Sequence, residues 1–171
     1  FEYRNNANVY ITLNYVDEAC HSRKQRDRLI EYAAPTTSDG DIVGYEWLMI
    51  DLDPHRASGT SSSNEQIKKE QQKAGKIYTY LKNQAWELPI VAMSGNGIHL
   101  LYKIELKNNA ENAKLIQNCL LVLNMMFADD ETDVDLKTFN PARVCKLYGT
   151  MARKGANTVE RPHRMSYIIN S

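Results

Sequence analysis

A mixed α+β fold, in which helices pack against one sheet, is predicted from three features of the sequence. Tyr45 to Leu52 is a continuous apolar run, which is typical of a buried central strand. Two further apolar stretches flank Ser94-Gly95-Asn96-Gly97, and an Asn-Gly pair in that position is a strong hairpin signal. Two amphipathic segments of helical period lie on either side of this hairpin. The order predicts hairpins and at least two helices against one sheet.

The strands are predicted from short stretches of β-branched and aromatic residues. Leu88 to Met93 and Ile98 to Ile104 form the two arms of the hairpin. Asn8 to Leu13 is predicted as an early strand, and Val144 to Tyr148 and Met165 to Ile169 as two late strands.

The first amphipathic segment follows a Ser-rich loop, and Ser63 or Asn64 can cap a helix that runs to about Asn83. Apolar residues recur along it at helical spacing, at Ile67, Ala74, Ile77, Tyr78 and Leu81. A second helix is predicted from Asn109 to Phe127, and His21 to Tyr32 is predicted to form a helix or an ordered loop.

The size and composition suit one globular domain over residues 1–171, since 43% of the residues are hydrophobic and 25% are charged. Because the chain begins at Phe1 and not at Met, we interpret it as a domain excised from a longer protein. No apolar run approaches the ~20 residues that would span a membrane. The cysteines, Cys20, Cys119 and Cys145, show no CxxC spacing and are expected to be reduced thiols of a cytoplasmic protein.

The formal net charge is zero, which weakly opposes a nucleic-acid-binding function. The distribution of charge softens this objection. Acidic residues crowd between Asp129 and Asp135, whereas the segment from Lys137 to Ser171 is basic and contains one acid, Glu160. A carboxylate cluster beside a basic segment suits a site that holds metal cations and polyanions together.

Asp51 and Asp53 end the central apolar strand. Because strand side chains alternate, both carboxylates point to the same face of the sheet, where they repel each other unless cations lie between them. Mg²⁺ is bound through one or two carboxylates together with substrate phosphates. A third carboxylate is expected from Asp133 or Asp135, which flank Val134. The alternative interpretation of the pair is a solvated strand end.

Ser94 to His99 reads Ser-Gly-Asn-Gly-Ile-His. Glycine permits a positive φ angle and close backbone approach, so amide groups of this turn can face an anion. His99 begins the following strand and is within reach of whatever the turn binds. The alternative is an ordinary hairpin with an incidental histidine.

A basic segment follows the acidic one. Arg143 immediately precedes the predicted strand Val144 to Tyr148, and Lys146 lies within it among apolar neighbours, so Lys146 needs an anionic partner to remain charged. Arg153 and Lys154 follow a Gly-Thr turn and can touch phosphates. A solvated basic loop is the alternative interpretation.

Taken in order, these motifs resemble those of the archaeo-eukaryotic primase superfamily, in particular the primase-polymerases of phages, plasmids and other mobile elements. The family's two aspartates after a hydrophobic strand match Trp47 to Asp53. Its small-residue turn before a histidine matches Ser94 to His99, and its single acid after a hydrophobic residue matches Val134-Asp135. In the mobile-element branch an Asn-Pro-Ala-Arg segment and a Lys-x-x-Gly-Thr turn follow, here Asn140 to Arg143 and Lys146 to Thr150, which favours Asp135 over Asp133.

The resemblance extends from about Val9 to Arg164, and it implies a DNA primase or DNA-directed polymerase of the prokaryotic cytoplasm. The fold it implies is an RRM-like sheet joined to a small N-terminal α/β unit, with the site in the cleft between them. Asp51, Asp53 and Asp135 would hold two divalent ions, Mg²⁺ or Mn²⁺. The nucleotide-binding residues it implies are Asn14, Ser94, Gly95, Gly97, His99, Arg143, Lys146 and Arg153.

The partners implied are a DNA template and primer and an NTP or dNTP, and a helicase or other domain can share the parent chain. The N-terminal unit is short for the family, and neither a zinc cluster nor a helical initiation domain is present. Two other functions stay open. One is a non-catalytic RRM-like module that stacks bases on sheet aromatics; the other is a metal-dependent rolling-circle nicking nuclease.

Overall fold

The computed structural model describes residues 5–23, 28, 30 and 32–170. A curled antiparallel sheet of six strands forms its centre, in the order β10, β4, β5 and β3, with β2 and β6 both pairing the outer edge of β3. The strands are β2 (Tyr15–Val16), β3 (Ile42–Pro54), β4 (Ile90–Met93), β5 (Ile98–Lys107), β6 (Thr132–Val134) and β10 (Tyr167–Asn170).

The long strand β3 separates two environments. Leu48, Ile50 and Leu52 are buried in the main core, while Asp51 lies on the opposite face because side chains alternate along a strand. β3 and β5 pair over most of their length, and this register sets Asp51 directly across from His99. The pairing therefore fixes both residues on the face of the sheet that points away from the core.

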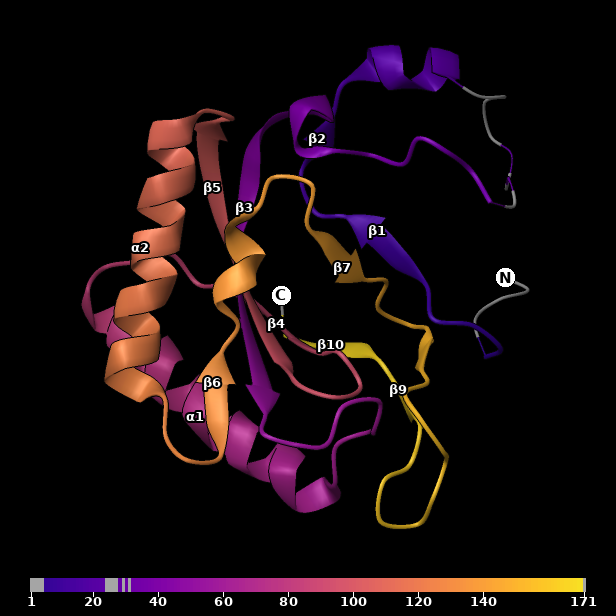
Figure 1. Ribbon diagram of the computed structural model, residues 1–171. Helices are drawn as coiled ribbons and strands as arrows, with labels where there is room; N and C mark the ends of the chain where they lie inside the picture. Colours follow the sequence, from indigo (N-terminus) through magenta and orange to yellow (C-terminus); the bar gives the residue numbers. More distant parts are fainter. Residues whose placement is uncertain (1–4, 24–27, 29, 31, 171) are drawn as a thin grey trace.

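Two helices cover the core face of the sheet, α1 (Asn64–Asn83) and α2 (Ala110–Phe127), as Figure 1 shows. Ser63 caps α1 through a capping box with Gln66. Asn109 caps α2 by accepting a hydrogen bond from the amide of Asn112. No helix among the described residues combines the length and the apolar character needed to cross a bilayer.

Two small sheets lie on the other side of the main sheet (Figure 1). One pairs β1 (Tyr10–Thr12) with β7 (Val144–Lys146), and the other pairs β8 (Met151–Ala152) with β9 (Arg164–Met165). A second apolar cluster of Met49, Leu101 and Cys145 joins β7 to the main sheet. The short 3₁₀ helices are η1 (Glu18–Arg23), η2 (Asp39–Asp41) and η3 (Leu136–Phe139).

The predicted α+β class and the hairpin across Ser94 to Gly97 are confirmed. The predicted strand Met165 to Ile169 is wrong as a single element, because Ser166 bonds the backbone of Thr150 and divides it into β9 and β10. Val144 to Tyr148 is strand only as far as Lys146. Of the segment from His21 to Tyr32, residues 24–27, 29 and 31 lie outside the described residues.

Gly97 marks the contact between the β4–β5 turn and the end of β3. A Cβ atom at this position would lie 2.2 Å from the carbonyl oxygen of Leu52, which is too close for any side chain. Gly75, in α1, offers a matched comparison because a Cβ atom there would meet nothing within 4 Å.

We expect Gly97→Ala to lower the free energy of unfolding by about 1–3 kcal/mol, since the strand end must shift to admit a methyl group. Gly75→Ala should raise it by about 0.5–1 kcal/mol through higher helix propensity. Urea denaturation of the two variants measures both changes. Equal stability of the wild type and Gly97→Ala would contradict the packing described here.

Candidate active site

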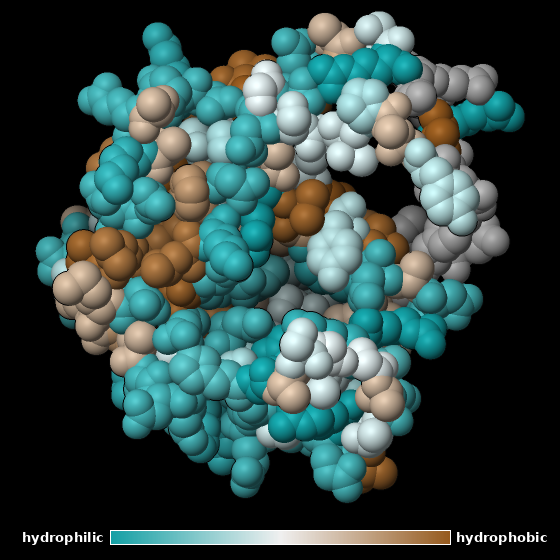
Figure 2. Space-filling view, in the orientation of Figure 1, coloured by the Kyte–Doolittle hydropathy of each residue, from teal (hydrophilic) through white to brown (hydrophobic). Residues whose placement is uncertain are grey.

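A cavity of about 470 Å³ opens between the exposed face of the main sheet and the two small sheets. In Figure 2 this side of the molecule is hollowed near its centre, and hydrophilic residues predominate around and below the hollow. Its charged lining divides into carboxylates and cations. The lining residues are Asp51, Asp53 and Asp135, Arg56, His99, Arg143, Lys146, Arg153 and Lys154, with Asn8, Tyr10, Met49, Ser94, Asn96, Val144 and Ala152.

Asp51 and His99 form an ion pair at the floor of this cavity. Asp51 Oδ1 lies 3.3 Å from His99 Nε2. Burial alone would raise the pKa of Asp51, but the charge of His99 outweighs it and the pKa is lowered. Burial likewise disfavours the imidazolium, but the carboxylate of Asp51 raises the pKa of His99 to about 10. His99 is therefore a cation that points into the site.

The other nitrogen of His99 is also occupied. Nδ1 lies 2.8 Å from the hydroxyl of Tyr148, which is in turn 3.4 Å from Cys145 Sγ. A protonated imidazole donates from both nitrogens, so the hydroxyl accepts from Nδ1–H. Tyr148 thus fixes the ring plane of His99 and directs Nε2 toward Asp51.

Asp53 is half exposed and pairs with the guanidinium of Arg56, whose Nη1 donates to Asp53 Oδ1 at 2.8 Å. Burial, followed by repulsion from Asp51, raises the pKa of Asp53. Arg56 is itself buried, and its Nε–H donates to the carbonyl of Thr60. The loop that follows β3 therefore places the positive charge of Arg56 beside the carboxylate of Asp53.

Asp135 reaches the cavity from the segment after β6. Its backbone amide donates to the carbonyl of Asp51 at 2.9 Å, and its carboxylate pairs with Arg143 at 2.5 Å. Asp133 lies opposite Asp53 in the β3–β6 pairing, but it bonds His55 and does not line the cavity. Asp135, rather than Asp133, therefore shares the cavity with the strand acids.

The donor chemistry of these carboxylates suits a divalent cation, although they do not form a closed cage. Among the described residues, no group of three or more His, Cys, Asp or Glu side chains has the spacing to hold a metal ion. Mg²⁺ needs fewer protein ligands, because one or two carboxylates with phosphates and water suffice. Asp51 and Asp53 lie two residues apart on one wall and can provide these oxygens.

The glycines of the β4–β5 turn do not line the cavity, whereas Ser94 does. Gly95 has a φ of 103°, and a Cβ atom there would lie 2.2 Å from that of Ala152. Ser94 Oγ accepts from the amide of Gly97 and closes the turn. Gly95 and Gly97 therefore allow the turn to pack closely, and Ser94 and Asn96 present the polar groups.

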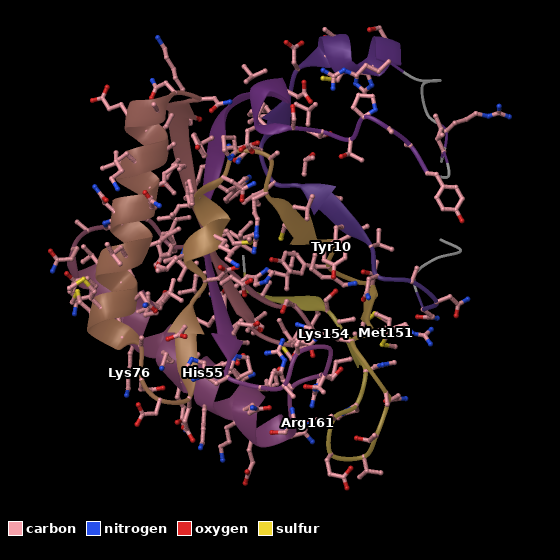
Figure 3. All side chains as sticks on the ribbon, viewed as in Figure 1. Tyr10, His55, Lys76, Met151, Lys154 and Arg161 are labelled. Atoms are coloured by element: carbon pink, nitrogen blue, oxygen red, sulfur yellow. The ribbon has the colours of Figure 1, made fainter. Side chains whose placement is uncertain are left out.

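The cationic wall comes from the small sheets. Lys146 is 4% exposed, donates to the carbonyl of Met151, and lies 5.3 Å from the ring centre of Tyr10. Burial lowers the pKa of Lys146. Arg153 is exposed and donates to the carbonyl of Asn5. Figure 3 labels Tyr10 and Lys154 on this side of the cavity.

Asn14 lies outside the cavity, unlike the other polar side chains that were predicted to bind the nucleotide. Its Oδ1 accepts from the amides of Glu46 and Trp47, and its Nδ2 donates to the carbonyl of Pro141. With its side chain buried in these bonds, Asn14 joins the N-terminal segment to β3.

Several residues at or near the site were not among the predicted ones: Asn8, Tyr10, Asn96 and Arg56 line the cavity, and Tyr148 and Glu70 lie behind it. Glu70 is fully buried in α1, and burial, followed by repulsion from Asp53, raises its pKa to about 9. The burial of Glu70 could have been predicted from the sequence, because Glu70 continues the buried stripe of Ile67, Ala74 and Ile77 at helical spacing.

No protein-family model, curated protein or solved structure is significantly similar to the chain. The site is therefore interpreted from its own geometry.

Glu70 makes the stability depend on pH. Its pKa is near 4.5 in the unfolded chain and about 9 in the folded one, so between these values only the folded state binds the proton. Stability therefore falls as pH rises through this window. The charged groups that act on Glu70 are Asp53, Asp51, Arg56 and Lys73.

We expect the stability advantage of Glu70→Gln over the wild type to grow by at least about 1 kcal/mol between pH 5 and pH 8, since glutamine does not ionise. Urea unfolding at several pH values measures this. Glu65→Gln, on the exposed first turn of α1, is the control and should show no such trend. Parallel pH profiles for the wild type and Glu70→Gln would contradict the burial cost.

Proposed function

We propose that the chain is the catalytic core of a primase-polymerase, which transfers a nucleotide from an NTP or dNTP to a 3′-hydroxyl on a DNA template. One observation carries this proposal: a single cavity is lined by the carboxylates of Asp51, Asp53 and Asp135 on the wall of the main sheet and by Lys146, Arg153 and Lys154 on the wall of the small sheets. Metal-dependent transfer of a polyphosphate substrate needs both kinds of wall in one site.

The arrangement of the sheet and the two helices in layers supports the proposal. An antiparallel sheet with two helices on one face and the acids on the other is the arrangement expected of the RRM-like half of the family that the motifs resemble. In this proposal the small sheets, which include β1, form the second half of the cleft. The order of the motifs in the sequence and the lining of the cavity are separate observations, and both select Asp51, Asp53, His99 and Asp135.

The cationic residues bind the triphosphate in this scheme. Lys146, Arg153 and Lys154 face the carboxylates across the cavity, and protonated His99 lies between the two walls. Ser94 and Asn96 add uncharged polar side chains to the lining from the β4–β5 turn, and the Ser94 hydroxyl is itself bonded to the backbone of Gly97. Divalent cations, when bound by Asp51, Asp53 and Asp135, would stabilise the negative charge that develops on the phosphates.

The proposed reaction is an in-line displacement at the α-phosphorus. The 3′-hydroxyl of the primer gives its proton to water as its oxygen forms a bond to the α-phosphorus, the bond from this phosphorus to the bridging oxygen breaks, and pyrophosphate leaves. The cationic wall would hold the departing pyrophosphate, because burial of Lys146 strengthens its attraction to an anion.

A nicking nuclease is the second candidate, because Tyr10 is 54% exposed and lines the same cavity as the acids. Such an enzyme would attack DNA with a tyrosine hydroxyl and form a covalent adduct. Incubation with single-stranded DNA and Mn²⁺, without nucleoside triphosphates, separates the two: cleavage that depends on Tyr10 would favour the nuclease.

We expect Asp51→Ala and Asp53→Ala to reduce primer extension by at least about 10²-fold, because each removes a carboxylate from the reacting wall. Extension of a labelled primer in Mg²⁺ and Mn²⁺ measures the rate. Asp133→Ala is the matched control, since this acid faces Asp53 but lies off the cavity. Folding of each variant is checked by circular dichroism, and near-normal extension by a folded Asp53→Ala would refute the role of Asp53.

His99→Ala should mainly raise the apparent KM for the triphosphate, since the lost imidazolium points into the cavity where phosphates would bind. Steady-state extension at varied dNTP concentration measures KM and kcat separately. An unchanged KM accompanied by weaker template binding would instead connect His99 to the DNA.

A further inference from the structure

Two buried side chains next to the carboxylate wall, a guanidinium and a carboxyl group, have atoms without a hydrogen-bond partner among the described residues. Arg56 has a side chain that is 4% exposed, and its Nη2 is unpaired. Glu70 is 0% exposed, and both of its carboxyl oxygens are unpaired. Buried polar groups in folded proteins nearly always find a partner, so two such groups in one place require an explanation.

Both groups adjoin Asp53. Arg56 uses Nη1 for Asp53 and Pro54 and Nε for Thr60, so only Nη2 has no partner. Glu70 reaches the same strand end from the core side of the sheet. Its Oε2 lies 3.5 Å from the position that a Cβ atom on Gly97 would take, and it experiences the charges of Asp53 and Arg56.

A cation that binds Asp53 through Oδ1 competes with Arg56 for that oxygen. Arg56 cannot simply move into solvent, because its side chain is buried and its Nε is held by the carbonyl of Thr60. A guanidinium that loses its acid while still buried is costly, and it would also repel the incoming cation. A second acid at the same strand end, on the core side of the sheet, removes this obstacle.

We propose that Glu70 is a positioning residue for the cation site: it is the second partner of Arg56, which Arg56 takes when a divalent cation occupies Asp53. This inference rests on the proposed function, because it assumes that Asp53 binds a cation. Arg56 then alternates between two carboxyl groups while remaining buried. The exchange explains why a carboxyl group without a partner is kept behind the strand end.

The exchange is tested by measuring how tightly the whole chain binds Mn²⁺. The EPR signal of free Mn²⁺ reports the fraction that is not bound. We expect Glu70→Gln to raise the Kd for Mn²⁺ by about tenfold, because a neutral amide holds the displaced guanidinium more weakly than a carboxylate does. Glu65→Gln, exposed on the same helix, should bind as the wild type does. Cooperative thermal unfolding of each variant without metal verifies that it is folded.

A merely structural role for Glu70 is separated by a double-mutant cycle with Arg56→Gln. If Glu70 acts through Arg56, Glu70→Gln has no further effect on the Kd in the Arg56→Gln background. The same tenfold loss in both backgrounds, or an unchanged Kd in the single variant, overturns the exchange while the cation site stands. Wild-type protein that does not bind Mn²⁺, or Asp53→Ala that binds as tightly as wild type, overturns the proposed function and the exchange with it.

Discussion

The pairing of β3 with β5 is the constraint on which the site depends. It buries Ile50 and Leu52 against the helices and, through the alternation of side chains, exposes Asp51 and His99 together on the other face. The amide of Asp135 then bonds the carbonyl of Asp51, and the hydroxyl of Tyr148 bonds His99. A slip of one residue in this register would turn the side chains of the shifted strand to the opposite face, so Asp51 and His99 would no longer share one.

Charge in the cavity is balanced locally, residue by residue. Asp51, Asp53 and Asp135 each have their own cation, His99, Arg56 and Arg143 respectively. Three carboxylates can therefore share a single cavity in a chain with no net charge. Glu70 is the exception to this balance, and it costs stability at neutral pH, as groups retained for function commonly do.

The features that follow from local pattern were predictable from the sequence. α1 runs from Asn64 to Asn83 as its cap and spacing predict, and the two-residue spacing of Asp51 and Asp53 predicts their shared face. The full length of β3, Ile42–Pro54, could not be predicted from the sequence. The two ends of this strand are held by pairing with β2 and β6, which lie far away in the sequence. The contact of Arg56 with Asp53 could not be predicted for the same reason, since a loop residue acquires its partners only in the folded chain.

The cationic wall is assembled from contacts between residues much farther apart in the sequence than those that place His99 beside Asp51. β1 pairs with β7, so Tyr10 meets Lys146 only after most of the chain has been brought together, whereas the β4–β5 hairpin that carries His99 is local. Contacts between residues so distant in sequence form slowly and late. During synthesis, the hairpin and its histidine can therefore be in place while the lysine that faces them across the cavity is still being added to the chain.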